Sequence, residues 1–261
     1  MSALSLSRPR LPRPARRTAF GQIVLNEARL TWRKPSGLIG GVAAPVVLLV
    51  IFDAIPAFRQ PVADLGGLTR LDVYVPILIA FSIGMLTLFG LPVPLASYRE
   101  LGILRRLSTT PVPPSWLLAA QGVVYMCVAL TGALLVLVGG IVLGAQVPRN
   151  IGGLVLSIVL SIAGLFPIGL VVAAVVQTPT GASVIGRVLF FPLIFLGGLW
   201  WPRELMPGVL QGISQGSPLG AAVEAMQDSM QGQFPPALPL LVLLAYGVVF
   251  GFLAKRFFRW E

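Results

Sequence analysis

The chain has 261 residues, of which 56% are hydrophobic and only 11% are charged, and its mean hydropathy is +0.89. A soluble domain carries about 25% charged residues, so this composition predicts a protein embedded in lipid. The net charge of +10 does not indicate nucleic-acid binding, because the basic residues lie in short segments between apolar runs and form no solvated basic face. The basic residues are better explained as parts of loops that face an anionic membrane leaflet.

Histidine is absent, and Cys127 is the single cysteine, inside an apolar run. These facts exclude a disulfide framework and a cysteine metal site, and they remove the commonest general base and zinc ligand. Neither lysine stands in a G-x-x-x-x-G-K-[ST] loop, so we expect the chain not to hydrolyse ATP by itself. We predict no catalytic residue, no metal and no cofactor in this chain.

The N-terminal region divides into two parts. Residues 1–17 are rich in arginine and proline and contain no acid, which predicts a disordered basic cytoplasmic tail. Residues 18–34 have the spacing of an amphipathic helix, and we expect it to lie in the membrane interface and to lead into the first span. A plain cytoplasmic extension of that span is the alternative. The expected apolar side comprises Phe20, Ile23, Val24, Ala28 and Thr31.

Residues 18–261 are predicted to form one all-α membrane domain. Each apolar segment is near or above the roughly 20 residues that a ~30 Å hydrocarbon core requires, although the fifth and sixth are short and prolines interrupt the second. The six expected spans are residues 37–57, 73–97, 116–144, 151–176, 184–201 and 237–254.

The distribution of basic residues predicts the orientation. The N-terminus, the 98–115 loop, the 177–187 turn and the C-terminus carry all but four of the 19 Lys and Arg residues. By the positive-inside rule both termini are cytoplasmic, which requires an even number of spans and agrees with six. The opposite side carries Arg59, Arg70, Arg149 and Arg203.

Few polar features stand inside the expected spans. Asp53, near the outer end of the first span, is the one acid embedded there, and an intramembrane acid is a functional candidate. Because it lies one turn from the interface, contact with water explains it at least as well. Glycines spaced for close helix approach occur at Gly37 and Gly41, Gly140 and Gly144, and Gly247 and Gly251, a weak signal in a chain with 29 glycines.

The loop of residues 97–121 is the most informative segment. Residues 98–107 have leucines at a spacing of three and charged residues between them, which predicts a short amphipathic helix on the cytoplasmic face. Prolines then end the helix and reset the chain before Trp116. Such a helix suits docking to a soluble partner, and an ordinary interfacial loop helix is the alternative.

The same loop contains the spacing E-x-G-x-L-x-x-L-x-x-T-P, from Glu100 to Pro111. This run resembles the loop signature of type 2 ABC transporter permeases, the drug- and polysaccharide-export family. Leu101 and Ile103 depart from the usual second acid and threonine of that pattern. The resemblance extends over nearly the whole chain and includes a long outer loop with Pro202, Pro207 and Pro218, part of which re-enters the outer leaflet in the family. It implies that the partner-coupling residues are Glu100, Gly102, Leu104, Arg105, Leu107, Thr110 and Pro111.

The resemblance also implies a function and partners. It implies the permease subunit of an exporter in the bacterial inner membrane, moving a lipophilic drug, lipid or glycan-type substrate. A separate ATP-binding-cassette subunit would hold ATP and Mg, and a second permease copy, identical or related, would complete the path. The residues leave open a secondary transporter, for which only Asp53 and Arg187 qualify as buried ionisable groups, and a membrane-embedded enzyme with a Ser or Asp site.

Overall fold

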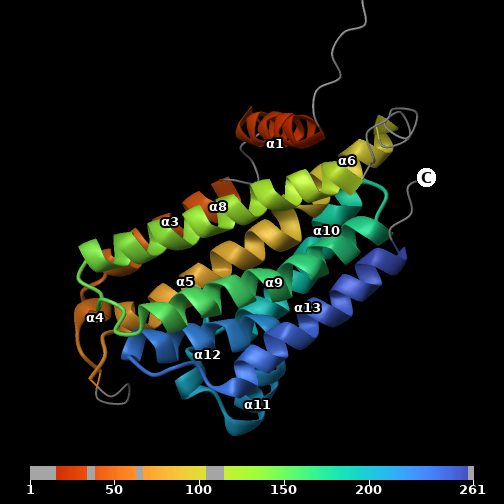
Figure 1. Cartoon of the computed structure of the whole chain (residues 1–261). Coiled ribbons are helices and arrows are strands. Elements are labelled where there is room, and N and C mark those ends of the chain that lie inside the picture. The colour runs from red at the N-terminus through yellow and green to blue at the C-terminus, as the bar shows by residue number, and fades with distance from the viewer. Residues whose placement is uncertain (1–15, 34–38, 63–66, 104–114, 258–261) are drawn as a thin grey trace, which may run out of the picture.

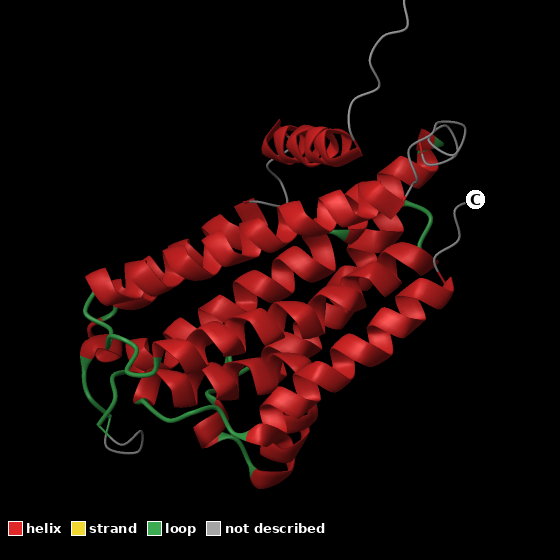
Figure 2. Cartoon of the chain, in the orientation of Figure 1, coloured by secondary structure: helices red, strands yellow, loops and turns green. Residues whose placement is uncertain are grey.

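The fold is seen in a computed structural model, which describes residues 16–33, 39–62, 67–103 and 115–257 (Figures 1 and 2). The described residues are mainly helical and form no strand. The helices and helical turns in chain order are α1 (Arg16–Arg33), η1 (Ile39–Ala43), α3 (Ala44–Ala54), α4 (Pro56–Arg59), α5 (Arg70–Met85), η3 (Leu86–Gly90), α6 (Pro92–Glu100), α8 (Ser115–Val142), α9 (Ile151–Val175), α10 (Pro179–Leu196), η4 (Arg203–Leu205), α11 (Gly208–Gly216), α12 (Pro218–Gln231) and α13 (Ala237–Phe257).

Five helices of the described chain are long and apolar enough to cross a membrane. They correspond to the second to sixth expected spans. The first expected span, residues 37–57, appears as the shorter apolar helix Ile39–Ala54, which is η1 followed by α3. The five long helices are Arg70–Glu100, Trp116–Val142, Ile151–Val175, Pro179–Leu196 and Ala237–Phe257.

The fifth span differs from the expected residues 184–201. It begins at Pro179, because Thr178 caps the helix with a side chain that accepts from the N–H of Gly181, and proline suits the first helical position. It ends before Gly198, whose φ of 93° cannot continue a helix. Arg187 therefore lies within α10 and not in a turn, and its exposed side chain donates to the carbonyl and hydroxyl of Ser183.

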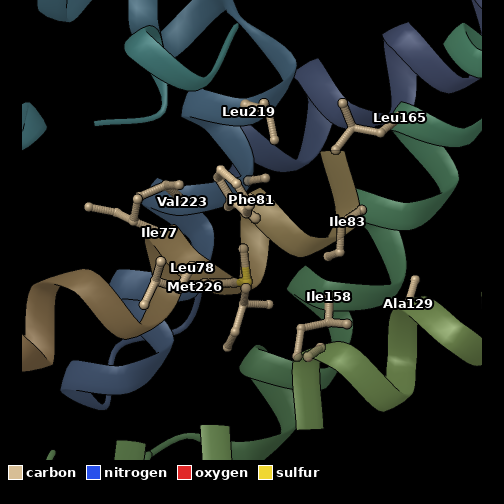
Figure 3. Packing of buried hydrophobic residues seen from close by; sticks show 14 of the residues in the cluster. Ile77, Leu78, Phe81, Ile83, Ala129, Ile158, Leu165, Leu219, Val223 and Met226 are labelled. Carbon is tan, nitrogen blue, oxygen red and sulfur yellow. The ribbon is translucent and has the colours of Figure 1, made fainter. Parts of the chain in front are cut away.

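Helix α5 is the centre of the bundle. Its apolar residues are buried on every side, because α3, α8, α9, α10 and α12 surround it. Figure 3 shows Phe81 of α5 beside Leu219 and Val223 of α12, with Ile158 of α9 nearby. A helix that is hydrophobic all round is expected to be buried in this way.

The long segment between α10 and α13 folds into helices, and prolines stand at the start of α11 and α12. Pro207 is the N-cap of α11 and Pro218 is the first residue of α12. Ser217 caps α12 at its start, and Gly232 ends it with a φ of 97°. Almost every residue of α12 is buried, because the helix packs against α5, α9 and α13 at the end of the bundle away from α1 (Figure 1).

Glycines allow α9 and α13 to approach closely, but the two glycines at the contact are not the predicted pair within one helix. A Cβ at Gly164 of α9 would lie 2.8 Å from the Leu243 carbonyl, and one at Gly247 of α13 would lie 3.0 Å from the Ala163 carbonyl. Gly251, the expected partner of Gly247 in its motif, faces open space. The contact therefore uses one glycine from each facing helix.

In each of the other two predicted glycine pairs, one glycine packs against a side chain of the second span. Gly140 packs against Val75, but Gly144 lies beyond the end of α8 with a φ of 99°. Gly41 packs against Leu86, while Gly37 lies outside the described residues.

Candidate coupling site at the end of α6

The second span ends in a turn where the sequence predicts partner coupling. Tyr98, Arg99 and Glu100 form the last turn of α6, so the expected separate helix of residues 98–107 does not begin at Tyr98. Leu101 follows as the C-cap, and Gly102 has a φ of 65°, a left-handed conformation that glycine adopts without strain. We call residues 98–102 the α6 terminus.

The structure describes only part of the predicted coupling set. Glu100 is exposed at the α6 terminus, and Gly102 makes the turn directly after it. The remaining predicted residues lie outside the described residues: Leu104, Arg105, Leu107, Thr110 and Pro111.

A buried acid joins α1 to this terminus. Glu27 of α1 is 5% exposed, and its carboxylate accepts hydrogen bonds from the hydroxyl of Tyr98 (2.9 and 3.2 Å) and from Nε2 of Gln121 in α8 (3.0 Å). An edge-to-face contact between Phe20 and Trp116, with ring centroids 5.8 Å apart, adds a second link between α1 and α8.

Arg99 attaches the terminus to a third helix. Its Nη1 donates to the carbonyls of Ala173 (2.5 Å) and Ala174 (2.9 Å), which lie in the last turn of α9. A cation in this position satisfies carbonyls that the helix leaves unpaired and favours the negative end of its dipole. The α6 terminus is thus bonded directly to α1 and α9, and through Glu27 it is connected to Gln121 of α8.

The sequence analysis did not single out Glu27. A glutamate in a basic amphipathic helix suggests a solvated face. Its spacing was nevertheless a signal, because it lies three residues after Val24 and four before Thr31, on the expected apolar side. The residues predicted for that side are all partly buried, and Leu25, Trp32 and Arg33 are exposed on the other.

A π-helical turn interrupts the second span ahead of the α6 terminus. In η3 the N–H of Leu91 donates to the carbonyl of Leu86, five residues earlier, at 3.0 Å. Pro92 and Pro94 cannot donate, so the ladder is weakened for a further turn. Such turns are frequent at functional sites and are places where helices bend.

Two neighbouring helices contact the backbone of η3 directly. A Cβ at Gly169 of α9 would lie 2.0 Å from the Thr87 carbonyl, and one at Gly186 of α10 would lie 2.4 Å from the Leu88 carbonyl. No side chain larger than hydrogen fits at these positions without a shift of the helices. The backbone of η3 therefore contacts α9 and α10 without intervening side chains.

The opposite end of the bundle holds two ion pairs. Asp53 accepts from Nε and Nη2 of Arg59 at 2.8 and 2.6 Å, and these bonds raise the pKa of the Arg59 guanidinium. The bidentate pair explains Asp53 as a structural residue at the end of α3. Arg203 donates to Glu224 at 2.7 Å and attaches η4 to α12.

Asp53 is not the one acid buried in a span. Asp72 is 7% exposed in the first turn of α5, where its carboxylate accepts from the N–H of Thr69 (2.9 Å) and from the N–H of Gln146 (2.7 Å). The hydroxyl of Thr69 in turn caps α5, which completes a capping box. Asp72 therefore begins the helix and fixes the segment after α8.

The long apolar helices and the short helix buried among them define a multi-pass membrane protein. A family model described as ABC-2 type transporter matches residues 18–234, and the chain belongs to this family. The family is the membrane component of a transport system that works with an ATP-binding subunit. No curated protein matches the chain.

Proposed function

We propose that the chain is the permease subunit of an ATP-binding-cassette exporter that moves a lipophilic drug, lipid or glycan-type substrate outward. A separate subunit binds ATP and Mg, and two permease copies, identical or related, form the path. The observation that supports this proposal is the α6 terminus, where Tyr98 bonds the start of the loop to α1 and Arg99 bonds it to α9. A push on this loop is transmitted to the bundle, as a transporter driven by an outside motor requires.

In this proposal the segment that begins at Glu100 docks onto the ATP-binding subunit, with Leu104 and Leu107 as apolar anchors. Glu100 is exposed and makes polar contacts with that subunit. Closure of the ATP-binding subunits pushes the loop and changes the packing of the spans between inward- and outward-facing states. The bond-breaking chemistry belongs to the partner.

The topology of the proposal has six spans in the bacterial inner membrane, with Ile39–Ala54 as the first. This 16-residue helix extends about 24 Å at 1.5 Å per residue, slightly less than the hydrocarbon core. Both termini are cytoplasmic. The exposed side of α1, with Leu25, Trp32 and Arg33, lies on the cytoplasmic leaflet, where basic and aromatic side chains are favoured.

A self-contained secondary transporter is less well supported. It needs ionisable groups at the midplane that bind and release an ion. The buried acids of the described chain are already paired: Asp53 with Arg59, Asp72 in a capping box, and Glu27, in the interfacial helix α1, with Tyr98.

Co-purification with an ATP-binding subunit encoded beside this chain, together with transport in vesicles, tests the proposal. Leu104→Asp and Leu107→Asp place a charge on a surface proposed to be apolar and should abolish both assembly and transport. Val209→Asp, at an exposed position of α11, is the matched control and should change neither. Normal assembly and transport by the two loop variants would refute the coupling role.

A further inference from the structure

Glu27 is a buried acid on a helix that is otherwise half exposed. Of the large apolar residues around it, Leu25, Leu30 and Trp32 are exposed, with Trp32 at 79%, and Ile23 and Val24 are only partly buried. The apolar contact of α1 that involves rings, between Phe20 and Trp116, leads to α8 and not to α6. The hydroxyl of Tyr98 joins α6 to α1 through hydrogen bonds to the carboxylate of Glu27.

Burying a carboxylate is costly unless it is hydrogen-bonded, so the position of Glu27 depends on its donors. Tyr98 and Gln121 supply them from two different helices. An apolar side chain would attach α1 to the bundle without this dependence. A carboxylate instead ties α1 to one particular hydroxyl, which stands in the last turn before the loop.

Gln121 holds an unused acceptor in the same cluster. Its Oε1 is buried and has no hydrogen-bond partner among the described residues, while its Nε2 donates to Glu27. An amide at position 27 could donate to this oxygen and still accept from Tyr98. Glu27→Gln is therefore a conservative variant that the site can accommodate, in contrast to Glu27→Ala.

We propose that Glu27 is a positioning residue that fixes α1 to the α6 terminus, so that α1 follows the loop when the ATP-binding subunits close. The inference rests on the proposed function in one respect, the source of the movement. The attachment itself is a property of this chain alone. Loss of the attachment lets the loop move without α1, so that less substrate is transported per ATP hydrolysed.

The attachment is tested on the purified chain without a partner. In a Cys127→Ser background, spin labels at the exposed positions Asn26 and Leu101 report the distance between α1 and the α6 terminus. Glu27→Ala and Tyr98→Phe should both broaden the distance distribution, and Glu27→Gln should leave it narrow. An unchanged distribution in Glu27→Ala would overturn the proposal.

The role in coupling is tested with the ATP-binding subunit in vesicles, as transport per ATP hydrolysed. Because Glu27→Ala removes hydrogen bonds to a charged group, we expect transport per ATP hydrolysed to fall roughly tenfold or more, while ATP hydrolysis itself is retained. Combining Tyr98→Phe with Glu27→Ala should lower the transport ratio little further, because both changes remove the same hydrogen-bonded contact. Glu27→Gln should restore most of the ratio, and Gln22→Ala, at an exposed position of α1, should match the wild type.

The outcomes separate the two proposals. A wild-type chain that shows no ATP-driven transport would overturn the proposed function, and the label distances would still decide whether Glu27 holds α1. A broadened distribution in Glu27→Ala with an unchanged transport ratio would overturn the coupling role of Glu27 and leave the permease assignment standing.

Discussion

Gly169→Ala tests the direct contact between α9 and the π-helical turn η3. The added Cβ would lie 2.0 Å from the Thr87 carbonyl oxygen, and ordinary contact begins near 3.4 Å. The two backbones must therefore separate by about 1.4 Å. Neither atom of the clash belongs to a flexible side chain, so no rotamer change relieves it.

The size of the effect follows from two opposing contributions. Overpacking a close-packed interior costs about 1–3 kcal/mol. Replacing glycine by alanine inside a helix returns up to about 1 kcal/mol, through the lower conformational entropy of the unfolded chain. We expect a net destabilisation of about 1–2 kcal/mol. Transport should fall further than the loss of stability alone explains. The reason is that the shift moves α9 away from η3, the turn that links α9 to the loop.

The assay is thermal unfolding of the purified protein in detergent, paired with transport in vesicles. Gly251→Ala is the matched control: it lies inside α13 with nothing within 4 Å of its added Cβ, and it should be neutral or slightly stabilising. Equal stability of the two alanine variants would refute the close contact at η3. Destabilisation of Gly169→Ala with normal transport would refute the link between this contact and function.

Two further predictions concern the other end of the bundle and the orientation. Arg203→Met leaves Glu224 without its partner and should destabilise the protein by about 3–5 kcal/mol, whereas adding Glu224→Met should recover much of the loss, as measured by thermal unfolding. With Cys127 removed, an impermeant thiol reagent should label a cysteine at exposed Gln231 in intact cells, and a cysteine at exposed Asn26 only after permeabilisation. Labelling of position 26 in intact cells would reverse the proposed topology.

Much of the bundle can be predicted from the sequence, because long apolar runs have few alternatives in a membrane. The second to sixth spans lie where hydropathy places them, apart from the start and end of α10. The apolar side of α1 is also recovered, since it depends only on helical periodicity. These are local properties of the chain.

The features that sequence reasoning missed depend on contacts between distant segments. Nothing in the composition of α12, with Gln227, Asp228 and Ser229, predicts a buried helix. Ser229 is accommodated there because its hydroxyl donates to the carbonyl of Ala225 in the same helix, and the hydroxyl of Ser157 in α9 donates to the same carbonyl. Glu27 was missed for the same reason, because its donors lie on α6 and α8, and one donor of Asp72 is Gln146, which lies 74 residues away in the segment after α8.

The site as a whole has the form of a short lever. Helix α6 has nine residues and is about 13 Å long, with η3 at one end and the α6 terminus at the other. We expect α6 to bend at η3, where prolines weaken the hydrogen-bond ladder. The glycine contacts at η3 would then pass the movement to α9 and α10, while Glu27 and Arg99 hold the other end of α6.

The lever distinguishes what the two kinds of variant should do. Gly169→Ala alters the pivot and leaves the α6 terminus intact, so it should lower transport per ATP without changing the distance between α1 and the α6 terminus. Glu27→Ala releases the other end and should change both. If both variants lowered transport and also broadened that distance, the effect would be general loosening of the bundle, and α6 would not act as a lever.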